Sequence, residues 1–287
     1  MATIWELDFY SRPLLDENKK KIWELAVCEA PLQVDSQLES LFRYAEFCPN
    51  SEVNSAWLKQ AIADAIARSP KPPDKIRFFR QAMNNMIMKA CTDLGIPAQL
   101  SRRTLALNQW LNQRLAEVYP TMAGFQAGSS PSVSFATIPP QPLPDALRGQ
   151  KWAFVGLDAQ VLQEMNQWEI GFGEAFPLAL TRLAPEAPVP GLIIFSSRAL
   201  PLAAWMSGLE LAFLKLDPGP PTRLLLETGI NDRWVLAALS TPDLRQEAEN
   251  FETAKQKAEG VHFLAVQPDP GSQAFAGFWL LQETVLA

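Results

Sequence analysis

The sequence has few residues suited to covalent or metal chemistry. It contains three cysteines, Cys28, Cys48 and Cys91, and one histidine, His262, in 287 residues. The cysteines are widely spaced and form no CxxC pair, which argues against a disulfide framework and a structural zinc site. We therefore expect three buried, reduced thiols. A single histidine excludes a two-histidine zinc motif, and His262, in the strand-like run GVHFLAV, is predicted to be structural.

Other absences narrow the function classes. The chain has no run of about 18 apolar residues, so no transmembrane segment is predicted. The N-terminal MATIWELDFYSRP enters strand-like sequence without a signal or transit segment, and we expect a cytoplasmic protein. No P-loop, Rossmann fingerprint, nucleophile elbow or zinc-protease motif is present, and no carboxylate pair marks an acid–base couple. We expect no enzyme activity, no cofactor and no metal site.

The charge of the chain is uneven. The formal net charge is −6, which discourages a simple picture of a basic nucleic-acid binder. From Lys71 to Arg114, however, eight basic residues stand against two acidic ones, so this segment carries 8 − 2 = +6. A basic segment in an acidic protein can form a local anion-binding surface. Solvated charge on helix surfaces is an equally common origin, so both interpretations stay open.

The clearest domain boundary is the proline-rich stretch GSSPSVSFATIPPQPLPDALRG, residues 128–149. Proline at this density disfavours both helix and sheet, because its ring fixes φ and removes a hydrogen-bond donor. We predict an extended linker at 128–149, between an N-terminal domain at 1–127 and a C-terminal domain at 150–287. A hydrophobic content of 48% can fill both cores.

The first domain is predicted to have the order β-β-β-α-β-α-β-α. Two strands flank a polar turn at residues 16–19, and FRYAEFCP is a third. Helices are expected at about residues 54–68, 81–94 and 104–119, with short strands at DKIRFFR and PAQLS. Asn54 or Ser55 is expected to cap the first helix, and Gly95 to end the second.

This order is the one found in ribonuclease-H-like domains, which raises a nuclease hypothesis. Such enzymes hold two metal ions with carboxylates on the first strand, on the first helix and after the fourth strand. Asp8 could be the first ligand and Asp64 the second, but RFFRQ places Arg80 where the third ligand is required. We predict that the metal site is missing if the domain has this fold.

Residues 150–287 are predicted to form a second α/β domain. A helix is expected at AQVLQEMNQW with Asp158 as its cap, another at LPLAAWMSG, and a long one begun by Thr241 and Pro242 and ended at Gly260. Strands are expected at KWAFVGL, GLIIFSS, LELAFLKLD, RLLLET, RWVLAAL, VHFLAVQ and AFAGFWLLQ. The predicted fold class is α/β, with two mixed-sheet domains joined by a proline-rich linker.

Arginine lies close to aromatic or further basic residues in DFYSR, KIRFFR, LSRR and FSSRA. Guanidinium groups neutralise phosphates and stack on bases, and aromatic rings offer platforms for unpaired bases. Phe78 and Phe79 have a structural alternative, since they are expected to alternate across a strand with one ring in the core. The candidate RNA-binding arginines are Arg12, Arg77, Arg80, Arg102, Arg103 and Arg198.

Several blocks closely resemble the Tab/Atab family, RNA-binding proteins of photosynthetic organisms. They extend from Thr3 to Gln282 and include TIWELDFYSRP, DENKKKIWEL, RFFRQAM, SRRTLALNQWL, GFQAG, KWAFV, SSRALPLAAWMSGLEL, GVHFLAVQ and GFWLLQ. The resemblance implies binding to A/U-rich single-stranded RNA, translation and biogenesis of photosystem I subunits with photosystem II left open, and no known enzymatic reaction. Because no transit segment precedes the first strand, the chain looks like a cyanobacterial member working in the cytoplasm or peripherally at the thylakoid membrane.

The resemblance also implies that Trp279, Leu280 and Leu281 bind RNA. In a strand, Trp279 and Leu281 would point to one face and Leu280 to the other, so the three could not form one stacking surface. We predict that Leu280 packs in the core with Phe278 and that the face of Trp279 is free for binding. The alternative is that all three residues only hold the strand in its sheet.

A second functional hypothesis also stays open. The protein could instead be a photosystem assembly factor that acts through contacts with translation or assembly proteins.

Overall fold

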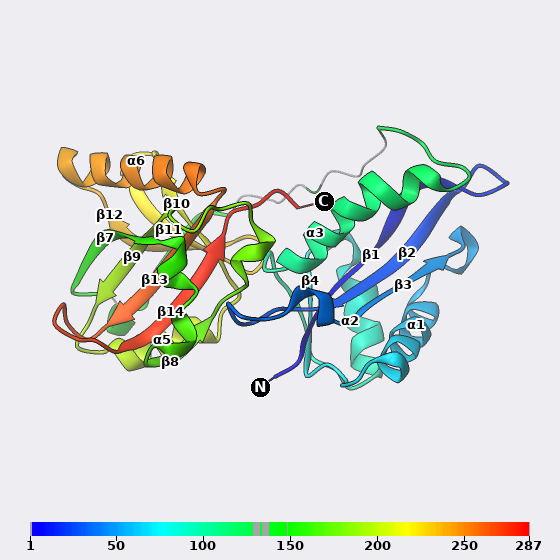
Figure 1. The fold of residues 1–287 in the computed structure, drawn as a ribbon, viewed down its shortest axis with the longest axis horizontal. Helices are drawn as coiled ribbons and strands as arrows, with labels where there is room; N and C mark the ends of the chain where they lie inside the picture. The colour runs from blue at the N-terminus through cyan, green and yellow to red at the C-terminus, as the bar shows by residue number, and fades with distance from the viewer. Residues whose placement is uncertain (1, 129–132, 134–137, 148, 287) are drawn as a thin grey trace. The chain divides into compact units, whose positions relative to one another are not determined.

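The computed structural model describes residues 2–128, 133, 138–147 and 149–286. The chain divides into two compact units, whose ribbons are shown in Figure 1. Unit 1 contains Met1–Ala30, Glu39–Phe135 and Val285–Ala287, and unit 2 contains Pro31–Leu38 and Ala136–Thr284. Two short segments, 31–38 and 285–287, therefore belong to a different unit from the sequence around them.

Unit 1 contains a five-stranded mixed sheet with the strand order β3-β2-β1-β4-β5. β1 and β3 are antiparallel to β2, whereas β1 and β5 are parallel to β4. The elements are β1 (Ile4–Leu15), β2 (Lys21–Glu29), β3 (Arg43–Cys48), α1 (Ser55–Arg68), β4 (Lys75–Phe78), α2 (Asn84–Asp93), β5 (Ala98–Leu100) and α3 (Leu105–Gln113). The predicted order of strands and helices is confirmed, while the comparison with ribonuclease H stays a prediction.

The helix boundaries of unit 1 follow from local signals in the sequence. The side chain of Asn54 accepts hydrogen bonds from the backbone N–H groups of Ala56 and Trp57, so α1 begins where the cap predicts. Gly95, with φ +71°, follows the end of α2. α3 is shorter than predicted and continues as a π-helical turn at Arg114–Val118.

The two faces of this sheet differ in chemistry. α1 and α2 pack on the face that carries Trp5, Leu7 and Phe9 of β1, and these side chains are fully buried. The alternate residues of β1 point to the other face, where Glu6 and Asp8 are buried as well. α3 lies over this polar face, and the backbone N–H of Leu107 donates to Glu6 Oε2 at 2.7 Å. The buried layer beneath α3 is therefore charged.

The GFQAG segment closes on the end of β1 through backbone hydrogen bonds. Leu15 N–H donates to Gly124 O, and Gln126 N–H donates to Pro13 O, each at 2.9 Å. Gly124 has φ +79°, and a Cβ atom there would lie 2.1 Å from Leu15 O. Only glycine fits this approach without moving the backbone.

Unit 2 contains two mixed sheets, with orders β10-β11-β12-β6 and β7-β9-β13-β14-β8. Its elements are β6 (Gln141–Pro142), β7 (Lys151–Asp158), α4 (Ala159–Leu162), β8 (Ile170–Glu174), β9 (Pro188–Phe195), α5 (Ala199–Ser207), β10 (Leu211–Asp217), β11 (Arg223–Thr228), β12 (Asp232–Ala238), α6 (Pro242–Lys257), β13 (Val261–Gln267) and β14 (Phe275–Gln282). Side chains of both sheets share one apolar cluster, so the main core lies between them. The mixed α/β class is confirmed.

Side chains bind the backbone of the edge strand β10. His262 Nε2 accepts from Leu214 N–H at 2.8 Å, and Lys255 Nζ donates to Leu214 O at 2.7 Å. Glu252 Oε1 accepts from Leu216 N–H at 2.7 Å. An uncovered strand edge could pair with another chain, and these contacts satisfy its polar groups instead. They also tie the smaller sheet to β13 and α6.

The predicted start of α6 is confirmed, and the helix ends at Lys257, three residues before the predicted Gly260, whereas the cap predicted at Asp158 is wrong. Thr241 Oγ1 accepts from Leu244 N–H at 3.3 Å, and Pro242 occupies the first turn. Asp158 makes no side-chain cap, and the helix after it covers only Ala159–Leu162. The physical reason is that Gln160 N–H, which such a cap would bind, already donates to a backbone carbonyl at 2.8 Å.

The proline-rich stretch is not free of sheet structure. β6, within the predicted linker 128–149, pairs in parallel with β12, with Pro142 opposite Val235. Proline is tolerated there because β6 is an edge strand. Residues 129–132, 134–137 and 148 of the predicted linker lie outside the described residues. Among the helices of the described part, none has the length and apolar character needed to cross a membrane.

Candidate functional site

Trp279, Leu280 and Leu281 lie in the interior of a sheet. β14 pairs with β13 on one side and with β8 on the other, so it is not an edge strand. Trp279 is 3% exposed, and Leu280 and Leu281 are 0% exposed. Buried side chains offer RNA no surface in this conformation, and direct RNA contact by these three residues stays a prediction.

Both faces of β14 are covered. Trp279 and Leu281 belong to the main core of unit 2, and α5 packs against the strand. On the opposite face, Phe278 stacks on Phe263 with ring centroids 5.0 Å apart. The prediction that the Trp279 face is free is therefore wrong, because a helix fills the space that a strand pattern alone leaves open.

Gly277 lets the Trp279 ring fold back along the strand. A Cβ atom at Gly277 would lie 2.3 Å from Cη2 of the Trp279 indole. The glycine of the GFWLLQ block is thus explained by the packing of the tryptophan that follows it. This arrangement gives the block a structural role whether or not it contacts RNA.

The polar face of unit 1 contains a buried ion-pair cluster centred on Asp8. Arg12 Nη1 donates to Asp8 Oδ2 at 2.8 Å, and Arg80 Nε donates to Asp8 Oδ1 at 2.7 Å. Arg12 Nε also donates to Glu24 Oε2 at 2.8 Å. Both guanidinium side chains are 5% exposed, and both carboxylates are 0% exposed. In this conformation, the ionic contacts of Arg12 and Arg80 are with the protein itself.

The cluster extends along β2 to the end of α3. Glu24 also forms an ion pair with Arg114 and accepts a hydrogen bond from the Tyr119 hydroxyl at 2.5 Å. Burial raises the pKa of Tyr119 to about 12, so its hydroxyl stays a donor at neutral pH. Burial alone would lower the pKa of Arg12, but neighbouring charges, Asp8 foremost, raise it above its ordinary value. We call Asp8, Arg12, Glu24, Arg80, Arg114 and Tyr119 the buried ion-pair cluster.

The two carboxylates of the nuclease hypothesis lie in different places. Asp8 lies on the face covered by α3, and both of its oxygens bind guanidinium groups. Asp64 belongs to α1, which packs on the opposite face, and it accepts from Gln60 Nε2 at 2.9 Å. Within the described residues, no three side chains of histidine, cysteine, aspartate or glutamate lie together as a metal site would require.

The remaining predicted arginines differ in exposure. Arg77 and Arg103 are buried, Arg102 is half-buried, and none of the three is without a partner. Arg198 is exposed at the start of α5, where its N–H donates to Ser196 Oγ at 3.1 Å. Phe78 and Phe79 are both fully buried, and of the two rings Phe78 alone belongs to the apolar core cluster described for unit 1, as expected for rings that alternate across the strand. A role in RNA binding stays a prediction for each arginine.

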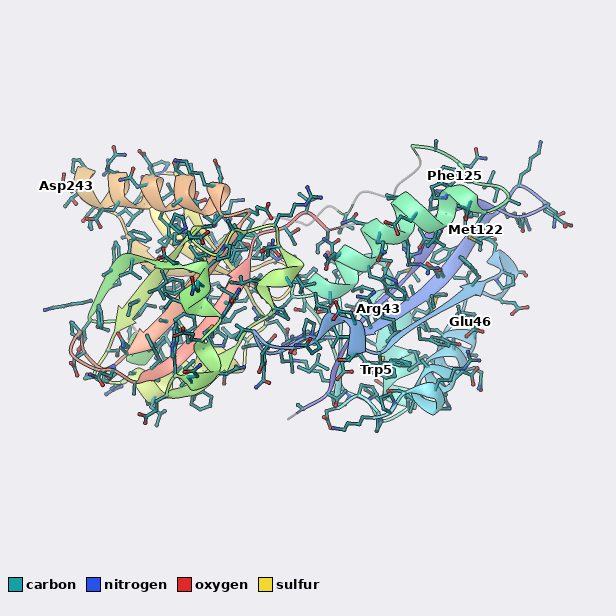
Figure 2. All side chains as sticks on the ribbon, in the orientation of Figure 1. Trp5, Arg43, Glu46, Met122, Phe125 and Asp243 are labelled. Carbon is teal, nitrogen blue, oxygen red and sulfur yellow. The ribbon has the colours of Figure 1, made fainter. Side chains whose placement is uncertain are left out.

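An exposed combination of arginine and tryptophan occurs elsewhere on unit 1. The Arg43 guanidinium, at the start of β3 (labelled in Figure 2), lies 5.8 Å from the ring centroid of Trp110 on α3. Arg114 lies 5.3 Å from the same centroid. Arg43 is exposed and Trp110 is half-buried. Sequence reasoning missed this Arg43–Trp110–Arg114 surface because Arg43 is far from the other two residues in the chain.

A second basic feature is the turn between β1 and β2. Lys19, Lys20 and Lys21 are all exposed there. Asp16 Oδ1 accepts from the N–H groups of Asn18 and Lys20 at 2.9 and 2.8 Å, which fixes the turn. Asp16 is thus used to hold the backbone, while the three lysine side chains and that of Glu17 face solvent.

Comparison with known proteins defines the class of this two-unit α/β protein as RNA-binding. Residues 4–114 match the family described as RNA-binding protein Tab2/Atab2, N terminal, and residues 130–282 match the C-terminal domain of the same family. The chain belongs to the Tab2/Atab2 family of RNA-binding proteins.

Two plant proteins are similar over most of the chain. One, from Zea mays, is described as Protein TAB2 homolog, chloroplastic; it is 42% identical over 284 residues, covering 96% of this chain and 70% of the relative. The other, from Arabidopsis thaliana and described in the same words, is 43% identical over 284 residues, covering 96% of this chain and 74% of the relative.

Among solved structures, parts of two retroviral integrases are similar. The HTLV-2 integrase catalytic core domain with magnesium shows 18% identity and a TM-score of 0.25, covering 42% of this chain and 74% of that one. The catalytic core domain of BIV integrase shows 14% identity and a TM-score of 0.23, covering 44% and 88%. These TM-scores are too low to support a conclusion about fold or activity.

Proposed function

We propose that this protein binds single-stranded A/U-rich RNA without catalysing a reaction, and that it promotes the translation and biogenesis of photosystem I subunits. Membership of an RNA-binding family supports the RNA partner. The preference for A/U-rich sequence and the photosystem role rest on the family resemblance. A site in the cytoplasm or at the thylakoid surface is part of the same proposal, and the two similar plant proteins are described as chloroplastic.

The structural observation that carries the proposal is the Arg43–Trp110–Arg114 surface. An acidic chain with net charge −6 needs a local concentration of cations to approach RNA phosphates. Arg43 is exposed, and the described contacts include no ion pair between it and a carboxylate, whereas Arg114 forms an ion pair with Glu24. The Trp110 ring beside them is suited to stack on an unpaired base.

The test measures binding of a short A/U-rich RNA by fluorescence anisotropy over a series of salt concentrations. Trp110→Leu is expected to lose about 1–3 kcal/mol of binding free energy, the range for one stacked base. Arg43→Gln is expected to weaken binding and to make the slope of log K against log salt shallower by about 0.7.

The matched control is Arg68→Gln. Arg68 is also exposed and lies 5.2 Å from an aromatic ring centroid, that of Tyr44, but on α1. Its substitution should leave the RNA affinity unchanged. If Arg43→Gln and Trp110→Leu bind RNA as the wild type does, with unchanged melting temperatures, this surface does not bind RNA. Failure of the wild-type protein to bind the RNA at all would overturn the proposed function.

A further inference from the structure

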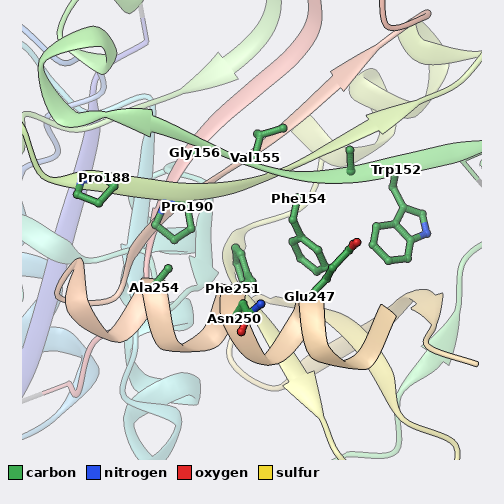
Figure 3. Close-up of a pocket in the computed structure, with 11 residues that line it drawn as sticks. Trp152, Phe154, Val155, Gly156, Pro188, Pro190, Glu247, Asn250, Phe251 and Ala254 are labelled. Carbon is green, nitrogen blue, oxygen red and sulfur yellow. The ribbon is translucent and has the colours of Figure 1, made fainter. Parts of the chain in front are cut away.

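Unit 2 contains an open groove between strand β7 and helix α6, with a volume of about 700 Å³. Figure 3 shows the rings of Trp152 and Phe154 on the side of β7 that faces the helix. β9 contributes Pro188 and Pro190, and α6 contributes Phe251. Every residue that lines the groove belongs to unit 2.

The wall of this groove is mainly aromatic and proline. Trp152 meets Phe154 edge to face with ring centroids 5.3 Å apart, and Phe154 stacks on Phe251 at 5.1 Å. Phe251 is buried and anchors the row in the main core, whereas Trp152 and Phe154 are half-buried. The row therefore keeps a fixed shape while two of its rings remain open to a ligand.

The charged part of the groove lining is acidic. Glu247 is its charged lining residue, and Asn250 adds an uncharged polar group one turn further along α6. Both side chains are exposed, and Figure 3 shows the Glu247 side chain extending from α6 toward β7. No lysine or arginine is among the residues that line the groove. The site can offer a carboxylate to a cation, but it has no cation for a phosphate.

Gly156 leaves room for a close approach to β7. No atom lies within 4 Å of where its Cβ would be, so the space above this residue is open. Gly156 lies opposite Pro190 in the pairing of β7 with β9. In the described sheet, β9 is the one strand that pairs with β7, which leaves the other edge of β7 without a partner strand. An extended chain can therefore lie along this part of the groove.

We propose that the β7–α6 groove binds an extended, proline-containing peptide of a partner protein that carries a lysine or arginine. Aromatic-lined grooves accept proline-rich segments because these segments are already extended and lose little conformational freedom on binding. The carboxylate of Glu247 matches a basic side chain in charge and sets the direction of the peptide. Single-stranded RNA could also stack on these rings, but its phosphates would meet Glu247 without a compensating cation.

The test uses the full chain and three fluorescent peptides. The first contains spaced prolines and one arginine, the second has glutamate in place of the arginine, and the third has glycine in place of the prolines. Anisotropy titrations are expected to show binding of the first peptide, with affinity at least about tenfold weaker for the other two. Equal binding of the arginine and glutamate peptides, or no binding of the first, would overturn the proposal.

Two variants locate the binding. Gly156→Val adds a branched side chain to the groove at a position where no atom lies within 4 Å of the added Cβ, and Glu247→Lys reverses the charge of the groove. Each substitution should weaken binding of the first peptide at least about tenfold. Glu249→Lys is the matched control, because Glu249 is exposed on the same helix but does not line the groove. It should bind the peptide as the wild type does.

Binding of A/U-rich RNA to the same variants separates this proposal from the proposed function. We expect Gly156→Val to bind RNA with wild-type affinity at an unchanged melting temperature. If Gly156→Val instead loses RNA affinity and keeps peptide affinity, the groove takes nucleobases and the peptide proposal is wrong. If the wild type binds the peptide but no RNA, the groove proposal stands while the proposed function fails.

Discussion

Asp8 lies between two buried guanidinium groups; its Oδ1 accepts a hydrogen bond from Arg80, and its Oδ2 accepts one from Arg12 and a longer one from Arg80. Taking three charges out of water is costly, and their mutual contacts compensate for that cost only while all are present. Arg12 Nη2 finds no hydrogen-bond partner within the described residues, so the cluster is already short of acceptors. Removing one carboxylate therefore leaves buried positive charge without compensation.

We predict that Asp8→Asn lowers the free energy of unfolding of unit 1 by about 3–5 kcal/mol. Hydrogen exchange of the β1 and β2 amides measures it locally. The control is Asp93→Asn, which breaks the exposed Lys89–Asp93 ion pair and should cost less than about 1 kcal/mol. Equal effects of the two substitutions would show that the cluster does not stabilise the fold.

His262 is buried as the neutral tautomer. Its Nε2 accepts from Leu214 N–H, so Nδ1 carries the proton that is donated to Gly260 O at 2.8 Å. Burial, with the charge of Lys255, lowers the pKa of His262 to about 3. Because the pKa of His262 is lower in the folded than in the unfolded state, the contribution of the neutral imidazole to the free energy of unfolding is fully present above about pH 6.5. This contribution is lost as the pH falls toward 3.

We predict that His262→Gln flattens the loss of stability between about pH 6 and pH 4. One proton taken up on unfolding contributes a slope of up to about 1.4 kcal/mol per pH unit. Urea unfolding of wild type and variant at several pH values gives the difference, in which the shared contribution of the carboxylates cancels. The variant should also be less stable at pH 7, because a buried backbone group loses its partner. Parallel pH curves would contradict this account.

At the scale of elements, local signals predicted most of the fold. The Asn54 cap, Gly95 and the pair Thr241 and Pro242 place helix ends because their interactions lie within a few residues of each other. The polar face of β1 could not be predicted in the same way. Alternating polar residues such as Glu6 and Asp8 are typical of a solvated face, and only the packing of α3 shows that they are buried.

The candidate site was predictable only in its residue types. The family resemblance indicated β14, but no sequence pattern indicates that helix α5 covers the strand. The arginine clusters were predicted because arginine and aromatic residues are adjacent in the sequence. In the structure, however, Arg12 and Arg80 form ion pairs with carboxylates that are distant in sequence. Arg43 and Trp110 come together only through the tertiary fold.

The burial of β14 gives a prediction for its tripeptide. Leu280→Ala should destabilise unit 2 by about 2–5 kcal/mol, as other large-to-small core substitutions do. RNA affinity, measured per folded molecule at low temperature, should be unchanged. Trp279→Leu should likewise destabilise unit 2 and leave the RNA affinity of the folded protein unchanged. A Trp279→Leu protein with the wild-type melting temperature and no RNA binding would show instead that this ring contacts RNA.

At the scale of the whole molecule, the chain passes between unit 1 and unit 2 more often than the single crossing that the predicted linker implies. Val285 O accepts from Asn108 Nδ2 at 3.0 Å, and Leu286 is 7% exposed, so residues 285 and 286 help to complete unit 1. So short a segment has no hydrophobic periodicity in its sequence from which its contacts with unit 1 could be predicted. Neither this exchange nor that of residues 31–38 could be predicted from composition or hydrophobic pattern.

We predict that Leu286→Ala lowers the free energy of unfolding of unit 1 by about 1–3 kcal/mol, since a buried leucine side chain is truncated. Val285→Ala is the control, because this neighbouring side chain is 88% exposed. Hydrogen exchange of α3 and β1 reports on unit 1, and exchange of β13 reports on unit 2. Equal effects on both units would contradict the assignment of this segment.

The contact between Asn108 and Val285 joins residues 177 positions apart, and this separation has a consequence for synthesis. At about 5–20 residues per second, a ribosome needs roughly 9–35 s to travel from one to the other. For most of that interval the strands and helices of the first-made unit have all been synthesised, but its closing segment has not. Its maturation is thereby timed by the translation of the second unit, and a pause in the second half of the message prolongs the life of an incomplete first half.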